Sequence, residues 1–147
     1  MDYNFPVVRT THPKARPADE TKLGFAKYFT DHMFAMDWDE GLGWHDGRVV
    51  PHEPLLIEPA SCVLHYAQMM FEGMKAYRTA DGEIQIFRPD MNVKRMARTC
   101  ERMCIPELPE DLLVAAVRAV IKEDIDWVPK APGTALYIRP FIFGDEV

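Results

Sequence analysis

Tyr137 and Arg139 are the two residues whose types and spacing point most directly to chemistry. They stand two positions apart in the segment 134–143, whose apolar and β-branched residues predict a strand. Side chains two apart on a strand project from the same face about 7 Å apart, so a guanidinium and a phenol lie side by side. Because arginine can bind both oxygens of a carboxylate, the pair predicts a site for an anionic group. An arginine on an exposed edge strand beside a solvated tyrosine would give the same pattern.

A local excess of basic side chains is the second feature that indicates anion binding. An amphipathic helix is predicted from Asp90, which is expected to cap its N-terminus. Its apolar arc contains Val93, Met96, Ala97, Cys100, Met103 and Cys104. Its opposite face carries Lys94, Arg95, Arg98 and Arg102. In a chain of net charge −6, a basic face suits an anionic cofactor such as a phosphate. A solvated helix surface is the alternative.

Aromatic residues form a third group of candidates. The segment 61–71 predicts a helix that runs to about Phe71, with Gly73 as its C-terminal cap. This helix is apolar on almost every side, which predicts that it is buried or covered on a second side by another domain or subunit. Tyr66 lies on it, and its hydroxyl needs a hydrogen-bond partner or a ligand. Phe71 and Phe29 are expected in a core from their type alone.

The remaining pattern indicates the elements that must position these residues. Strands are predicted over 30–38, 48–50, 74–78, 84–87 and 134–143, and a further helix over about 110–127. Gly41-Leu42-Gly43 and the Asp46-Gly47 pair are expected to form the turn of the first hairpin. Residues 1–22 show no apolar period and predict an N-terminal arm, while residues 23–147 predict one small domain. The fold class is α+β, with an antiparallel or mixed sheet and helices on one face.

Composition excludes several classes of protein. A chain that is 48% hydrophobic and 27% charged can bury a core, so it is not intrinsically disordered. Its 17 basic against 23 acidic residues argue against a nucleic-acid or anionic-membrane partner. Three cysteines do not suit a secreted disulfide framework, and no histidine or cysteine spacing indicates a metal site. The sequence also lacks an apolar segment for a signal peptide or membrane span, so we expect a cytoplasmic protein.

Four motifs in a fixed order resemble those of a known family. They are FTDHMF at 29–34, LHYAQMMFEGMKAYR at 64–78, IFRPDMNVKRM at 86–96 and LYIRP at 136–140. Together they resemble the branched-chain amino acid aminotransferases, which are class IV pyridoxal-phosphate enzymes. The resemblance extends from about residue 23 to residue 147.

The resemblance implies a role for each candidate residue. The parent enzyme would exchange amino groups between leucine, isoleucine or valine and 2-oxoglutarate or glutamate, as a homodimer that binds pyridoxal 5′-phosphate. Arg95 matches the arginine that contacts the cofactor phosphate. Tyr137 and Arg139 match the pair that recognises the side-chain carboxylate of glutamate. Aromatic walls of the substrate pocket would come from Phe29, Tyr66 and Phe71.

The resemblance also implies that this chain is only the small N-terminal domain. The lysine that forms the Schiff base with the cofactor belongs to a large second domain, and no lysine here matches its motif. We therefore expect no catalytic residue within residues 1–147 and no activity from this polypeptide alone. Other class IV enzymes, a D-amino acid aminotransferase or an aminodeoxychorismate lyase, are alternatives. A non-catalytic binding or dimerisation module with the same fold is another.

Overall fold

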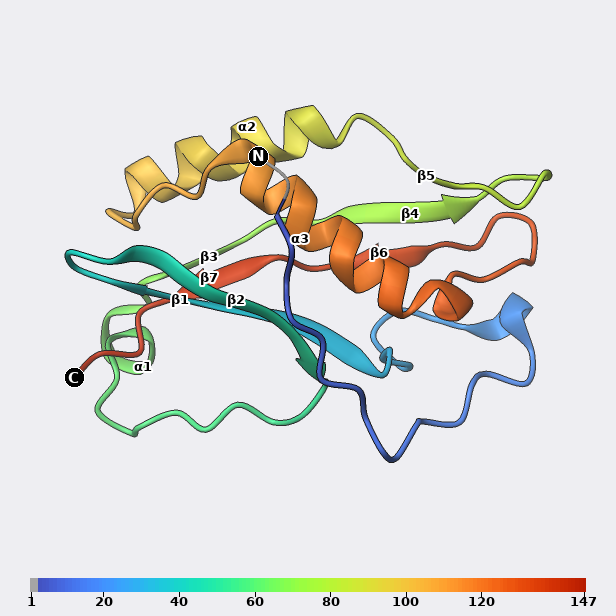
Figure 1. The fold of residues 1–147 in the computed structure, drawn as a ribbon, viewed down its shortest axis with the longest axis horizontal. Helices are drawn as coiled ribbons and strands as arrows, with labels where there is room; N and C mark the ends of the chain where they lie inside the picture. Colours follow the sequence, from blue (N-terminus) through green and yellow to red (C-terminus); the bar gives the residue numbers. More distant parts are fainter. Residues whose placement is uncertain (1–2) are drawn as a thin grey trace.

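The computed structural model describes residues 3–147 as an α+β arrangement of short strands and two long helices (Figure 1). The strands are β1 (His32–Asp39), β2 (Gly43–Pro51), β3 (Met69–Phe71), β4 (Met74–Arg78), β5 (Ile84–Ile86), β6 (Leu136–Ile138) and β7 (Phe141–Phe143). The helices are α1 (Cys62–Tyr66), α2 (Pro89–Arg102) and α3 (Glu110–Glu123), with 3-10 turns η1 (Glu20–Lys22) and η2 (Ile125–Trp127). Strand pairing is antiparallel: β1 with β2, β3 with β7, and β4 with both β5 and β6. The predicted fold class is confirmed.

The core lies where the two long helices meet the strands. α2 and α3 pack against each other, α2 also contacts β3, and α3 contacts β1 and β2 (Figure 1). The buried apolar side chains are Val93, Met96 and Cys100 from α2, Leu113, Val117 and Ile121 from α3, and Met70, Met74 and Ala76 from the strands. Burying a large aliphatic side chain contributes about 1.5–3 kcal/mol, so this cluster holds the helices on the strands. The predicted periodicity of both helices is confirmed over these positions.

The first hairpin turns at the Gly41-Leu42-Gly43 part of the predicted turn and not at the Asp46-Gly47 part. β1 and β2 are joined through residues 40–42, and the Asp46-Gly47 pair lies inside β2. There the register shifts, because Asp46 and Gly47 together face a single residue of β1, Met36. Asp46 has a φ of 53°, a conformation that aspartate tolerates better than most residues. The pair therefore forms a β-bulge, and the predicted turn at this position is wrong.

The prediction of one buried helix over 61–71 is wrong. α1 covers only five residues and ends at Ala67, which has the left-handed φ of 53°. The chain then continues as β3, because Met69–Phe71 pair with β7 instead of extending the helix. Leu64 and Tyr66 are 59% and 79% exposed, so α1 is a surface element. Gly73 does not cap a helix but lies between β3 and β4.

Three predicted boundaries shift at the ends of the helices. Arg88, with a φ of 47°, is the cap of α2, and Pro89 is its first residue. Asp90 therefore lies in the first turn, where its carboxylate binds Arg88 instead of capping the helix. α2 ends at Arg102, so Cys104 leaves the apolar arc and is exposed. α3 ends at Glu123, and the predicted extension to residue 127 forms η2.

The last predicted strand is divided in two. β6 and β7 are separated by Arg139 and Pro140. Proline has no N–H to donate to a ladder, so a continuous strand cannot pass through this position with full pairing. β6 instead pairs with β4, and β7 pairs with β3. Arg139 lies at the junction of the two pairs of strands.

The predicted N-terminal arm lies along the domain from residue 3 onward. The Val8 N–H donates to the Val49 carbonyl at 2.9 Å, and the Val49 N–H donates back to the arm at 3.0 Å. Phe5 of the arm packs so closely over the bulge that a Cβ at Gly47 would lie 2.8 Å from its ring. The arm therefore adds a short parallel bridge to β2 and covers part of the first hairpin.

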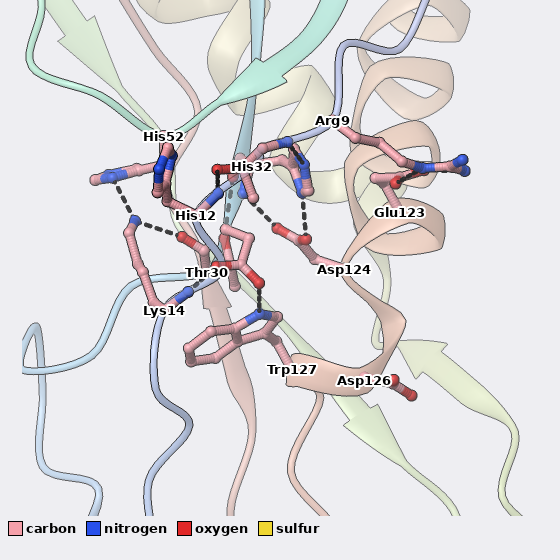
Figure 2. Close-up of polar contacts among 12 residues, drawn as sticks. Arg9, His12, Lys14, Thr30, His32, His52, Glu123, Asp124, Asp126 and Trp127 are labelled. Atoms are coloured by element: carbon pink, nitrogen blue, oxygen red, sulfur yellow. Dashed lines mark hydrogen bonds and ion pairs between the residues drawn. The ribbon is translucent and has the colours of Figure 1, made fainter.

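A buried histidine and aspartate join the arm, β1 and the end of α3 (Figure 2). His32 and Asp124 are 7% and 4% exposed. The Thr10 N–H donates to His32 Nε2 at 3.0 Å, which leaves the ring proton on Nδ1. Nδ1 donates to Asp124 Oδ1 at 2.7 Å, and the His32 N–H donates to Oδ2 at 2.8 Å. Each oxygen of Asp124 therefore receives one hydrogen bond from the same residue.

A second carboxylate extends this contact toward η2 (Figure 2). Asp31 accepts the Lys14 N–H at 2.7 Å and the indole N–H of Trp127 at 2.9 Å. Burial alone would raise the pKa of Asp31, but these hydrogen bonds and the neighbouring positive charge lower it. The arm is thus bonded to the domain at several points that lie far apart in the sequence.

We predict that Asp124→Asn lowers the free energy of unfolding by about 2–4 kcal/mol, because the amide N–H₂ would face a buried donor and leave it unsatisfied. Urea denaturation of the chain measures this difference. Asp126→Asn is the matched control, since Asp126 is 71% exposed and binds the exposed Arg16. Equal losses in the two variants would show that the His32–Asp124 contact does not hold the arm in place.

Candidate functional site

The strands around residue 72 present two different faces. Met70, Glu72, Met74 and Ala76 alternate along the chain and are buried on the side of the helices. The residues between them project to the other side, and those of β6 and β7 join them there through the strand pairing. We call this second side the outer sheet face, formed by Met69, Phe71, Tyr77, Tyr137, Arg139 and Phe141. Four of its members are at least 40% exposed although apolar or aromatic: Met69, Phe71, Tyr77 and Phe141.

Tyr137 and Arg139 lie together on the outer sheet face, as their spacing predicts. Arg139 Nη2 donates to the Tyr137 hydroxyl at 2.8 Å. The guanidinium carbon lies 4.4 Å above the centre of the Phe71 ring and 5.1 Å from that of Tyr137. No carboxylate within residues 3–147 pairs with Arg139. The cation is therefore held by a hydroxyl and two aromatic rings, with its remaining donors able to bind an anion.

Two residues that the sequence did not place beside Tyr137 complete its surroundings. A Cβ at Gly73 would lie 2.2 Å from the Tyr137 hydroxyl, so only glycine leaves room for the phenol. Phe25 meets the ring of Tyr137 edge-on, with centroids 5.0 Å apart. The sequence pattern assigned Gly73 to a helix cap, so its place between two strands was missed. Phe25 gave no signal, because it stands in a loop without periodicity.

Arg95 lies on the helix side and is held by a buried carboxylate. Glu72 is 3% exposed, and its Oε2 accepts from Arg95 Nη2 at 2.8 Å while Oε1 accepts from Arg95 Nε. Glu72 also accepts from Asn92 Nδ2 at 2.9 Å and from the Gly73 N–H at 3.0 Å. Burial would raise the pKa of Glu72, but Arg95, Asn92 and the Gly73 N–H together lower it. Sequence reasoning did not identify Glu72, although its inward position in the strand alternation required a partner for a buried charge.

The basic face of α2 remains open to solvent. The Arg95 side chain is 60% exposed, and its Nη1 makes no hydrogen bond within residues 3–147. Lys94, Arg98 and Arg102 are exposed on the same helix, and no ion pair joins them to the described part of the chain. The predicted clustering of positive charge on this helix is therefore present. Its anionic ligand stays a prediction.

Phe29 and Tyr66 are not brought to Arg139 by any contact between described residues. The ring of Phe29 stacks on His52, with centroids 5.2 Å apart. Tyr66 is 79% exposed, and among residues 3–147 its one ring neighbour is His65. Of the three aromatic residues predicted to line a pocket, the structure places only Phe71 against the arginine.

The candidate residues lie on open surfaces and not in an enclosed cavity. Hollows of about 210 and 880 Å³ are lined mainly by the arm and α3, and neither includes Arg95, Tyr137 or Arg139. Within residues 3–147, histidine, cysteine and acidic side chains nowhere gather in the threes that a metal ion requires. None of the helices in the described range has the length and apolarity needed to cross a membrane.

Comparison with known proteins finds branched-chain-amino-acid aminotransferases among the relatives of this chain. The chain is 51% identical to branched-chain-amino-acid transaminase 1 of Bacillus subtilis over 138 residues, which are 94% of this chain and 38% of that protein. It is 48% identical to the branched-chain-amino-acid aminotransferase of Mycobacterium tuberculosis H37Rv over 146 residues, 97% of this chain and 40% of that protein. The chain thus spans about 40% of the length of these curated relatives. No protein-family model matches it.

Solved structures give the same result. The crystal structure of the Escherichia coli branched-chain amino acid aminotransferase aligns with a TM-score of 0.55 and 30% identity, over 67% of this chain and 31% of that one. The T.th. branched-chain amino acid aminotransferase, complexed with N-(5′-phosphopyridoxyl)-L-glutamate, aligns with a TM-score of 0.54 and 31% identity, over 66% of this chain and 31% of that one. Both comparisons cover a part of a longer enzyme.

We predict that Glu72 makes stability depend on acid pH. Its pKa in the folded state lies below the ordinary value of 4.5, so its contribution is present above that pH and is lost as the pH falls through the folded pKa. Wild type should therefore lose more unfolding free energy than Glu72→Gln between about pH 6 and pH 3. Urea titrations across this range measure both slopes. If the unfolding free energies of the two proteins fell in parallel with pH, the ionised Glu72 carboxylate would not be stabilised by its partners.

Proposed function

We propose that this chain, a homologue of the branched-chain-amino-acid aminotransferases over about 40% of their length, is the small N-terminal domain of such an enzyme. The whole protein would exchange amino groups between leucine, isoleucine or valine and 2-oxoglutarate. In this proposal it binds pyridoxal 5′-phosphate and acts as a cytoplasmic homodimer. The residue that bonds covalently to the cofactor lies elsewhere in the protein, so residues 1–147 alone are inactive.

The observation that carries the proposal is the contact of Arg139 with Tyr137 and Phe71. A branched-chain aminotransferase must accept both an apolar side chain and the carboxylate of glutamate in one place. The aromatic ring of Phe71 offers apolar surface, and the guanidinium 4.4 Å above it offers charge-assisted donors. When an apolar side chain is bound, Arg139 keeps the Tyr137 hydroxyl and the two rings as partners, so its charge is not left without compensation.

The residues present also fit the phosphate of the cofactor. Arg95 is exposed, is already oriented by Glu72, and has Nη1 free of any partner in residues 3–147. Lys94, Arg98 and Arg102 add positive charge on the same helix, which attracts a dianion. Arg95 would hold the phosphate by charge-assisted hydrogen bonds. Bound pyridoxal phosphate would supply an electron sink for chemistry at the substrate Cα.

The remaining pocket assignments rest on the exposed aromatic residues. Phe29, Tyr66 and Phe71 are 52%, 79% and 57% exposed. Exposed aromatic side chains are costly to hydrate, and they are typical of surfaces that another part of a protein or a ligand covers. In the proposal these residues form apolar walls beside the outer sheet face. The glutamate-derived ligand named for the T.th. enzyme supports a site that also accepts an acidic side chain.

The test begins with the reading frame that encodes this chain. The proposal expects it to continue beyond Val147 into a second domain that carries the reactive lysine. The complete protein should then gain a visible absorbance band with pyridoxal phosphate. It should also transfer the amino group of leucine, isoleucine and valine to 2-oxoglutarate. A frame that stops near Val147, or a complete protein that acts only on D-amino acids, would refute the proposal.

We predict that Arg139→Met in the complete protein lowers kcat/KM for glutamate about 10- to 100-fold more than for leucine, because only glutamate loses a charge-assisted hydrogen bond. Single-turnover half-reactions with each amino acid separate the two effects. Arg118→Met is the control, since Arg118 is an exposed arginine on α3. Equal losses for glutamate and leucine would show that Arg139 supports the shape of the site and does not recognise the carboxylate.

A further inference from the structure

We propose that Glu72 is a positioning residue that orients the guanidinium of Arg95 toward the cofactor phosphate. This inference rests on the proposed function, since it takes the phosphate as the ligand of Arg95. Glu72 itself touches no ligand in this proposal. It acts through Arg95, by fixing two of the three guanidinium nitrogens and so deciding where the third one points.

Glu72 can act in this way because burial and hydrogen bonds restrain its carboxylate. Glu72 is 3% exposed, and its carboxylate accepts hydrogen bonds from the Gly73 N–H, from Asn92 Nδ2, and from Nε and Nη2 of Arg95. The Gly73 N–H belongs to the strand junction, and Asn92 and Arg95 are three apart on α2, so they share one side of that helix. The carboxylate is therefore fixed to a strand and a helix at the same time.

Arg95, unlike Glu72, is exposed and has few partners. Its side chain is 60% exposed, and its guanidinium has no hydrogen-bond partner other than Glu72 within residues 3–147. An arginine of this kind would otherwise sample many rotamers in solvent. Glu72 takes the edge formed by Nε and Nη2, which leaves Nη1 without a partner in residues 3–147 and able to donate to an anion. A donor that is oriented before binding loses less entropy when it meets its anion.

The charge of Glu72 works against the same anion. A carboxylate on one edge of the guanidinium repels a phosphate on the other edge. Glu72→Gln would therefore have two opposite effects on phosphate affinity: it would weaken the orientation of Arg95 and remove the repulsion by the carboxylate. Glu72→Asp avoids this problem, because it keeps the negative charge and shortens the side chain by one methylene. The fork to Nε and Nη2 is then lost while the electrostatic field stays nearly the same.

The chain offers a matched control at the start of the same helix. Arg88 and Asp90 form the same kind of fork, Nε to Oδ1 at 3.0 Å and Nη2 to Oδ2 at 3.1 Å. There both side chains are about half exposed, at 58% and 47%, and the two residues are local neighbours. Asp90→Glu changes the length of this carboxylate and keeps its charge, and it leaves Glu72 and Arg95 in place, so it matches Glu72→Asp.

The experiment measures the dissociation constant of pyridoxal phosphate for the apo form of the complete protein, by absorbance or fluorescence titration. Glu72→Asp should raise this constant about 5- to 30-fold, the factor that corresponds to ordering one long side chain on binding. Asp90→Glu should leave it unchanged. In an Arg95→Ala background, Glu72→Asp should have no further effect, because there is no guanidinium left to orient.

The outcomes separate the inference from the proposed function. An unchanged constant in Glu72→Asp, or an equal rise with and without Arg95, would overturn the positioning role while the enzyme assignment stands. A wild-type protein that does not bind pyridoxal phosphate would overturn both. If Glu72→Asp does not fold, Asn92→Ala replaces it. That variant removes the Nδ2 hydrogen bond to Glu72 without changing any charge. It should raise the dissociation constant of pyridoxal phosphate by a smaller factor, and only when Arg95 is present.

Discussion

The burial of the Glu72 carboxylate sets a condition that the neighbouring structure must meet. Removing a charged group from water costs several kcal/mol unless hydrogen bonds and an opposite charge compensate. Here the compensation comes from the Gly73 N–H, Asn92 and Arg95, so α2 must turn this side toward the junction of β3 and β4. Asn92 stands at the edge of the apolar arc of α2, and Arg95, three residues later on the exposed side, binds the same carboxylate. The ion pair and the buried apolar side chains therefore fix the same rotation of the helix.

The alternation of the strands then determines what lies on the other side. Because Glu72 projects toward α2, its neighbours Phe71 and Gly73 face outward. Gly73 leaves the space that the Tyr137 hydroxyl occupies, and Phe71 lies beneath Arg139. Three consecutive residues thus position two cationic groups. Glu72 holds Arg95 on one side, while Phe71 and Gly73 support Arg139 and its partner Tyr137 on the other. This link explains how one short segment can serve both a phosphate and a side-chain carboxylate in the proposed enzyme.

Sequence reasoning succeeded where the signal was local. The spacing of Tyr137 and Arg139 depends only on the period of a strand, and the core positions of α2 and α3 depend only on the period of a helix. It failed where distant partners decided the outcome. The segment 61–71 is apolar enough for a buried helix, but pairing of Met69–Phe71 with β7 requires residues about 70 positions away. The contacts of Thr10 with His32 and of Lys14 with Asp31 are of the same kind, because single hydrogen bonds between remote segments leave no periodic pattern.

The environment of Arg139 separates it from the other arginines of the described chain. Five of them pair with a carboxylate and one donates to backbone carbonyls, so contacts within the domain explain them: Arg9, Arg16, Arg48, Arg88 and Arg95, and Arg78. Arg98, Arg102 and Arg118 are exposed on helix surfaces, where water is an adequate partner. Arg139 belongs to neither group, because a tyrosine hydroxyl and two aromatic rings hold it without a paired carboxylate. Aromatic faces stabilise a cation less than a carboxylate does, so this arrangement leaves binding energy available to an incoming anion. A site that must bind leucine and glutamate in turn requires this intermediate state, in which the cation is compensated enough to tolerate an apolar ligand and not so fully that it ignores an acidic one.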